Sequence, residues 1–329
     1  MNQTQAASGG LQRYLTPLGA WALAFGCAVG WGAFVMPGNV FLPLAGPLGT
    51  ALGILIGGAL LMLIAVNYHF LIQKYPDAGG AFTYTKKIFG YDHGFLCAWF
   101  LVLTYVAIVW ANATALTLVA RNILGDVFQF GLHYQLAGFD IYLGEVMLSI
   151  LALAVCGAIC LWNTLAKNVQ IIMALVLIGG IVICFVACWA GHEGGLETMK
   201  PAFAPGDVPV KQVIGIVFLA PWAYIGFESI SHSAGEFSFS FKKAGRIMII
   251  ALLTAAAAYA LLAIMAVMSL PGGFSDWPHY IANLGNLSGV EGLPTFYAIY
   301  SVLGENGVLI LGLTILGGII TGLDRKSVV

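Results

Sequence analysis

Residues 26–37 read Gly26-Cys27-Ala28-Val29-Gly30-Trp31-Gly32-Ala33-Phe34-Val35-Met36-Pro37, in the middle of the first long apolar segment. Three glycines and a proline disfavour an unbroken helix, because glycine gains backbone freedom outside it and proline lacks an amide donor. A helix that breaks inside a membrane leaves N–H and C=O groups unpaired, and these are tolerated where they face a cavity or ligand. We expect this break to form half of a substrate site. The alternative is close helix packing, which small residues also favour.

The composition is that of an integral membrane protein. Of 329 residues, 60% are hydrophobic and 8% are charged, whereas a soluble domain has roughly 25% charged residues. A spanning helix needs about 20 apolar residues. Hydropathy predicts eight such segments, at residues 17–42, 44–73, 94–124, 142–163, 168–190, 211–234, 246–270 and 306–323. These runs are long and not strictly alternating, which predicts an all-α polytopic protein rather than an outer-membrane barrel.

Lysine and arginine predict the orientation of the chain. With a cytoplasmic N-terminus, ten basic residues lie inside, namely Arg13, Lys74, Lys86, Lys87, Lys167, Lys242, Lys243, Arg246, Arg325 and Lys326. Three lie outside, namely Arg121, Lys200 and Lys211. The excess of positive charge on the inside predicts a multi-pass protein of the cytoplasmic membrane, with residues 1–16 as a cytoplasmic tail.

The cysteines give no indication of a metal site. All six lie in or beside apolar segments, and the two pairs with helical spacing, Cys156/Cys160 and Cys184/Cys188, have no suitable histidine or carboxylate beside them. We interpret them as packing residues. We expect neither a metal nor another cofactor, and no nucleic-acid partner.

The sixth apolar segment contains a second interruption. Residues 220–236 include Pro221, Gly226 and, at membrane depth, the carboxylate of Glu228. A carboxylate inside a membrane is costly and indicates a functional site. His232 follows Glu228 by four residues, so both can share one helix face. The alternatives are a structural hydrogen bond for Glu228 and helix packing for His232. In the third segment, Asn112 is a further candidate for lining a cavity.

The loop after the second segment carries a motif made of Tyr75, Pro76, Ala78, Gly79, Gly80 and Tyr84, followed by Phe89-Gly90. This motif resembles the cytoplasmic loop after the second helix of the amino acid–polyamine–organocation transporter superfamily. Trp222-x-x-Ile225-Gly226-x-Glu228-Ser229 is similar to the sixth helix of the arginine/agmatine antiporters and their relatives. The resemblance implies that Trp222 stacks on substrate and that Glu228 links protonation to transport.

The resemblance also implies a leucine-transporter-type fold of inverted five-helix repeats, in which helices 1 and 6 are both interrupted. In this arrangement the N–H groups at the first break would hold a substrate carboxylate, and the carbonyl groups at the second would accept from its ammonium. The candidates at the first break are Val29, Gly30, Trp31, Gly32 and Ala33. Those at the second are Ala223, Tyr224, Ile225 and Gly226, and Glu228 and His232 are the candidates for proton coupling.

These features predict a secondary active transporter of amino acids or related amines, and not an enzyme. Its partners would be a small-molecule substrate, protons and membrane lipid, and it would work by alternating access as a proton symporter or an exchanger. The alternatives are a polyamine or organocation permease, a channel, or a non-transporting membrane protein.

The chain is short for the superfamily that it resembles, whose members usually have ten or twelve helices, since its second repeat stops after three. The ending Asp324-Arg325-Lys326-Ser327-Val328-Val329 reads like a translated sequencing adapter. We therefore expect a transporter domain at 17–323 with an incomplete second repeat and a non-native tail at 324–329. The alternative is a natural basic tail.

Overall fold

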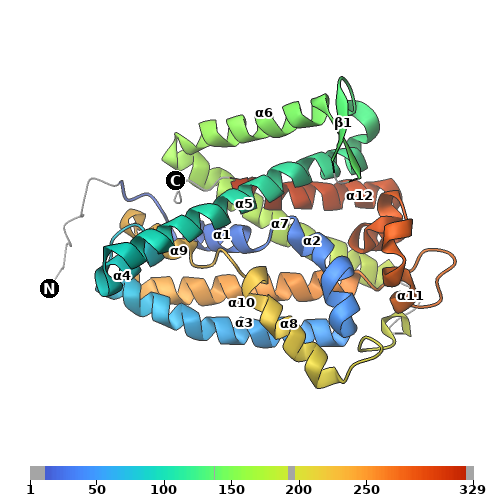
Figure 1. Ribbon diagram of the computed structural model, residues 1–329, viewed down its shortest axis with the longest axis horizontal. Helices are drawn as coiled ribbons and strands as arrows, with labels where there is room; N and C mark the ends of the chain where they lie inside the picture. Colours follow the sequence, from blue (N-terminus) through green and yellow to red (C-terminus); the bar gives the residue numbers. More distant parts are fainter. Residues whose placement is uncertain (1–11, 137, 192–196, 324–329) are drawn as a thin grey trace.

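The computed structural model describes residues 12–136, 138–191 and 197–323 as a bundle of long apolar helices (Figure 1). Within these residues, six helical stretches are long and apolar enough to cross a membrane. They contain α3 (Leu42–Lys74), α5 (Tyr91–Leu124), α6 (Leu143–Cys160), α7 (Asn163–Gly191), α10 (Ala244–Met265) and α12 (Pro294–Leu323). Two shorter apolar helices, α1 (Pro17–Ala28) and α8 (Pro209–Ala223), account for the remaining predicted segments. The prediction of an all-α polytopic membrane protein is confirmed.

The first predicted break separates α1 from α2 (Gly32–Met36). Thr16 caps the start of α1 through a hydrogen bond from the Gly19 amide to its hydroxyl oxygen (3.1 Å). After the break, α2 continues without interruption through the π-helical turn η1 (Pro37–Phe41) into α3. The second half of this interrupted helix therefore extends through η1 to the kink at Gly46 near the beginning of α3.

A sharp kink interrupts α3 near its beginning. Gly46 has φ +66°, and a β-carbon there would lie 2.7 Å from backbone atoms of Phe203 and Ala204. Only glycine combines this conformation with so close an approach of another chain segment.

The sixth segment, expected at 211–234, is also interrupted, and its break falls within the predicted stretch 220–236. The helix α8 ends at Ala223, an irregular turn with Gly226 at φ +115° follows, and the short helix α9 covers Ser229–His232. The 3₁₀ turn η4 (Ala234–Glu236) then leads to a bridge between Phe237 and Leu15. The two interrupted helices thus meet a second time, just before α1 begins.

Short elements occupy the two ends of the bundle (Figure 1). Helix α4 (Gly80–Phe89) lies at the same end as α9. At the opposite end are the antiparallel hairpin of β1 (His133–Leu136) and β2 (Phe139–Tyr142), and helix α11 (Trp277–Ala282). The sequence did not indicate the hairpin. The remaining short turns are η2 (Gly125–Phe128), η3 (Glu197–Met199), η5 (Phe241–Lys243), η6 (Leu284–Asn286) and η7 (Gly289–Gly292).

Two aromatic side chains in the polar stretch between α10 and α12 are packed inside the protein. Trp277 and Tyr280 are buried, and their polar atoms donate hydrogen bonds to the carbonyl groups of Pro201 (2.9 Å) and Glu291 (2.7 Å). Helix α12 begins at Pro294, and a kink at Gly304 (φ +58°) divides it, so its second part coincides with the predicted segment 306–323. Aromatic residues that could have faced a membrane surface are packed inside the protein instead.

Candidate functional site

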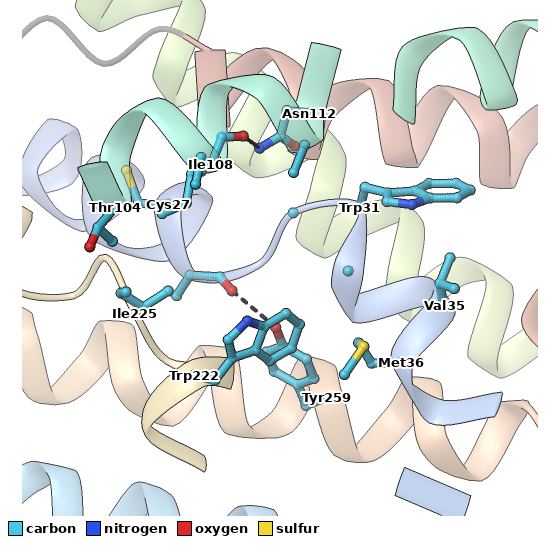
Figure 2. A pocket seen from close by; sticks show the side chains of 15 residues that line it. Cys27, Trp31, Val35, Met36, Thr104, Ile108, Asn112, Trp222, Ile225 and Tyr259 are labelled. Carbon is cyan, nitrogen blue, oxygen red and sulfur yellow. Dashed lines mark hydrogen bonds between the residues drawn. The ribbon is translucent and has the colours of Figure 1, made fainter. Parts of the chain in front are cut away.

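A cavity of about 590 Å³ borders the break between α1 and α2 (Figure 2). Its walls come from both sides of this break, from α5, from the end of α8 with the turn that follows, and from α10. The lining residues are Cys27, Ala28, Gly30, Trp31, Gly32, Val35, Met36, Thr104, Ala107, Ile108, Ala111, Asn112, Trp222, Ile225 and Tyr259.

At the first break, three consecutive amide groups are left without partners. Val29 donates to the Phe25 carbonyl (2.9 Å), and Ala33 donates to the Gly30 carbonyl (3.1 Å). The N–H groups of Gly30, Trp31 and Gly32, by contrast, have no hydrogen-bond partner among the residues that the structure describes. Of the five predicted residues, Gly30, Trp31 and Gly32 line the cavity, whereas Val29 and Ala33 are fully buried beside it.

The second break leaves unpaired carbonyl groups. Tyr224 and Gly226 use their carbonyl oxygens within the turn, accepting from Phe227 (3.4 Å) and Ser229 (3.0 Å). Within the described part of the chain, no donor reaches the carbonyl oxygens of Ala223 and Ile225. Ile225 lines the cavity; Ala223 and Tyr224 are buried, and the Tyr224 hydroxyl donates to the carbonyl of Ile54 (2.8 Å).

Trp222 lies in the cavity, where the sequence motif suggested a stacking residue. Its side chain is 48% exposed, and its ring packs on Gly32, where a β-carbon would lie 3.0 Å from Cη2. Figure 2 shows Trp222 and Tyr259 on one side of the cavity, with Asn112 and Ile108 on the other. Tyr259 donates its hydroxyl to the Ala28 carbonyl (3.2 Å), which stabilises the end of α1.

Asn112 holds α5 against the break. Its amide nitrogen donates to the Ile108 carbonyl (2.9 Å), while its Oδ1 is buried and has no partner within the described residues. Glycines allow this close approach, because β-carbons at Gly30 and Gly322 would lie 3.3 Å and 3.2 Å from Oδ1. The candidate from the third segment therefore contacts both the first break and α12.

Helix α12 also holds the residues around the break, a role that the sequence did not reveal. Thr321 donates its hydroxyl to the Gly26 carbonyl (3.1 Å), and Thr295 donates to that of Phe34 (2.8 Å). The ring of Trp31 meets Phe296 edge-on, with 6.4 Å between centroids. One long helix thus supports the chain before and after the break.

Glu228 and His232 do not line the cavity; they form a buried cluster with Tyr105 of α5. The Tyr105 hydroxyl donates to Glu228 Oε1 (3.1 Å) and lies 3.3 Å from His232 Nε2. The Gly226 amide donates to the other carboxylate oxygen (2.8 Å). Tyr105 is adjacent in sequence to Thr104, a lining residue, so the cluster lies one residue from the cavity wall.

The loop motif packs directly on this cluster. The Gly79 amide donates to the His232 carbonyl (3.3 Å), and a β-carbon at Gly80 would lie 2.5 Å from Ser231 Oγ and 2.9 Å from His232 Nδ1. Within the motif, Tyr84 is buried against Tyr75, with ring centroids 6.3 Å apart. Pro76 and Ala78 lie in the turn before α4, where the Ala78 carbonyl accepts from the Thr83 hydroxyl (3.0 Å). The structure thus brings together two motifs that are about 150 residues apart.

Several lining residues were not predicted from the sequence. Tyr259 could have been predicted, because a tyrosine in an otherwise apolar segment weakly indicates a residue that faces a cavity. Val35, Met36 and Ile108 carried no signal, because apolar side chains in apolar helices look alike whether they face a cavity, lipid or another helix.

Two discontinuous helices that border one cavity, within a bundle of membrane-spanning helices, define a polytopic membrane protein with the architecture typical of secondary transporters. The amino acid permease family model matches residues 15–324. The chain belongs to this family, within the superfamily that the loop motif resembles.

The curated relatives are amino acid and metabolite transporters. The chain is 25% identical to cationic amino acid transporter 4 of Mus musculus, over 92% of the chain and 48% of that protein. It is 26% identical to a branched-chain amino acid permease of Lactococcus lactis, over 86% of the chain and 60% of that protein. It is also 26% identical to a methylthioribose transporter of Bacillus subtilis, over 70% of the chain and 50% of that protein. The chain spans about half the length of these curated relatives.

Proposed function

We propose that this chain carries the substrate site of a secondary transporter for amino acids or related amines in the cytoplasmic membrane. One observation supports this most strongly: Gly30 and Trp31 at one break have unpaired N–H groups, Ile225 at the other break has an unpaired carbonyl, and all three residues line one cavity. Donors at one side and acceptors at the other match the carboxylate and ammonium of an α-amino acid.

The proposed binding mode follows from this polarity. The amides of Gly30, Trp31 and Gly32 hold the substrate carboxylate at the beginning of the helical stretch that continues into α3. The carbonyl oxygens of Ala223 and Ile225 accept from the ammonium. Trp222 covers the substrate, since its exposed ring already packs on Gly32 at the cavity wall.

The proposed coupling group is the cluster of Glu228, Tyr105 and His232. Tyr105 can accept a hydrogen bond from His232 while it donates to Glu228, which gives a chain of exchangeable protons beside the cavity. A protonation change at Glu228 would alter its hydrogen bond from Gly226, in the middle of the second break. This links proton binding to the conformation of the substrate site, as proton symport or pH-controlled exchange requires.

Uptake into liposomes tests this proposal. The purified protein is reconstituted, loaded with unlabelled amino acids and assayed for uptake of a mixture of radiolabelled amino acids, with empty liposomes as control. Saturable uptake that increases with a preloaded substrate supports the proposal. Linear, non-saturable flux would indicate a channel, and no flux above the control would contradict it.

The orientation of the protein is part of the same proposal. We infer that the N-terminus and α4 face the cytoplasm, as the distribution of lysine and arginine predicts. Cysteine substitutions at Lys87 and at Ser275, labelled from outside intact cells with a membrane-impermeant reagent, test it. Labelling at position 275 alone agrees with the inference, and labelling at position 87 alone reverses it.

A further inference from the structure

We propose that the cavity selects neutral amino acids with an apolar side chain and excludes lysine-like amino acids and diamines, an inference that rests on the proposed function. The relatives do not decide this point, because their names include cationic amino acids, branched-chain amino acids and putrescine. The chemistry of the cavity wall decides it.

Apart from Thr104 and Asn112, the wall is formed by apolar or aromatic side chains and backbone. Around the first break it consists of Cys27, Ala28, Val35 and Met36, together with Trp31 and two glycines. On α5 it consists of Ala107, Ile108 and Ala111, and opposite them lie Trp222, Ile225 and Tyr259. None of the 15 lining residues, all within the described part of the chain, is aspartate, glutamate, lysine, arginine or histidine.

The polar side chains on the wall already make hydrogen bonds within the protein. Thr104 donates its hydroxyl to the Phe100 carbonyl (2.8 Å), and Tyr259 donates to that of Ala28 (3.2 Å). The amide nitrogen of Asn112 is bonded to Ile108, and its Oδ1 is buried between two glycines. The groups left for a substrate are therefore the unpaired backbone groups of the two breaks and the Oδ1 of Asn112, and none of these carries a negative charge to pair with a side-chain ammonium.

The carboxylate of the sixth segment does not supply a counter-charge inside the cavity. Glu228 is outside the lining, and its two oxygens accept hydrogen bonds from Tyr105 (3.1 Å) and the Gly226 amide (2.8 Å). A second ammonium on a substrate side chain would be desolvated among Ile108, Met36 and Trp222 without an anionic partner, which is strongly unfavourable. A diamine would in addition leave the N–H groups at the first break without a carboxylate.

Norleucine and lysine form a matched pair for testing this inference, because they differ by one terminal amine. The purified protein is equilibrated with radiolabelled leucine, and unlabelled norleucine, lysine and putrescine are added as competitors. We expect lysine and putrescine to compete about a hundredfold more weakly than norleucine, the effect of an uncompensated charge in an apolar site. Lysine or putrescine competing within about threefold of norleucine would overturn the inference.

A charge placed on the wall provides the second test. Ile108→Asp adds a carboxylate to the cavity, and Ile108→Asn adds a side chain of nearly the same shape without the charge. We expect Ile108→Asp to raise the affinity for lysine relative to norleucine by about tenfold, which corresponds to about 1.4 kcal/mol of binding free energy. Ile108→Asn should leave the relative affinity unchanged. Equal ratios in the two variants would overturn the assignment of selectivity to wall charge.

The wild-type comparison does not depend on whether the variants fold. Binding of lysine without binding of leucine or norleucine would overturn this inference while leaving the proposed transport of amino acids intact. Binding of no amino acid at all would overturn both.

Discussion

Tyr105 on α5 and Glu228 in the sixth segment are joined by a hydrogen bond of 3.1 Å, although 123 residues separate them in the sequence. This contact connects the wall of the cavity to the turn that follows α8. His232 lies at the other side of the same hydroxyl, and the Gly79–Gly80 turn packs on His232. A continuous set of contacts therefore runs from the cavity to α4.

Substitution of Glu228 tests its role in proton coupling. Glu228→Gln preserves the shape and one acceptor of the side chain but replaces the carboxylate with a neutral amide. We expect uptake by the wild type to rise as the external pH falls, uptake by the variant to be independent of pH between about 5 and 8, and substrate binding to remain. Glu305→Gln, at an exposed position on α12, is the control and should keep the wild-type profile. An unchanged pH profile in Glu228→Gln would remove this residue from the mechanism.

Tyr105→Phe removes the hydroxyl that joins His232 to Glu228 and keeps the ring that packs beside them. A hydrogen bond to a charged group contributes about 1.5–3 kcal/mol, so we expect proton-driven accumulation to fall about tenfold or more. Exchange of substrate without a proton gradient should change less than threefold, about 0.7 kcal/mol. A parallel loss of both activities would indicate that Tyr105 has a purely structural role.

The ring of Trp222 is expected to contribute much of the substrate affinity. Loss of a stacked aromatic at a binding site typically costs about 1.4–2.7 kcal/mol, so Trp222→Ala should weaken binding about 10- to 100-fold, while Trp222→Phe should retain most of it. Trp110→Ala is a matched control, because Trp110 on α5 is 70% exposed and lies outside the cavity lining. Equilibrium binding of labelled substrate measures each variant, and equal losses in Trp222→Ala and Trp110→Ala would refute a specific role for Trp222.

Gly80 is expected to tolerate no side chain. Gly80→Ala places a β-carbon in a left-handed conformation (φ +45°), which costs about 1–2 kcal/mol, and also 2.5 Å from Ser231 Oγ. Gly289→Ala carries similar backbone strain (φ +61°) with nothing within 4 Å of the added carbon. Thermal unfolding followed by fluorescence should therefore show a larger loss of stability for Gly80→Ala, together with reduced uptake. Equal losses in the two variants would show that the contact with α9 contributes nothing.

Much of the fold could be predicted from the sequence, because charged residues are few in this chain and closely spaced glycines and prolines weaken a helix locally. The segment containing Gly30 and Gly32 breaks where predicted, and so does the segment containing Gly226. Both predictions rest on backbone chemistry, which the local sequence determines directly.

The contacts that support the site could not be predicted, since they depend on which helices become neighbours. Nothing in the sequence near Thr321 indicates a hydrogen bond to Gly26, and nothing near Tyr105 indicates Glu228. The burial of Trp277 was missed for a related reason, because an aromatic residue in a polar stretch suits a membrane surface as well as a packed core. The hairpin was missed because its two short strands, β1 and β2, pair only with each other, and hydropathy does not reveal such local pairing.

The most direct test of the account concerns the substrate carboxylate. The amino acid that binds best is compared with its carboxamide in equilibrium competition on the wild-type protein, since the amide keeps the shape and the ammonium but loses the negative charge. If the N–H groups of Gly30 and Trp31 hold the carboxylate, the carboxamide should bind about 10- to 100-fold more weakly, a loss of about 1.5–3 kcal/mol for charge-assisted hydrogen bonds. A carboxamide that binds as well as the amino acid would contradict the central claim that the first break is the carboxylate site.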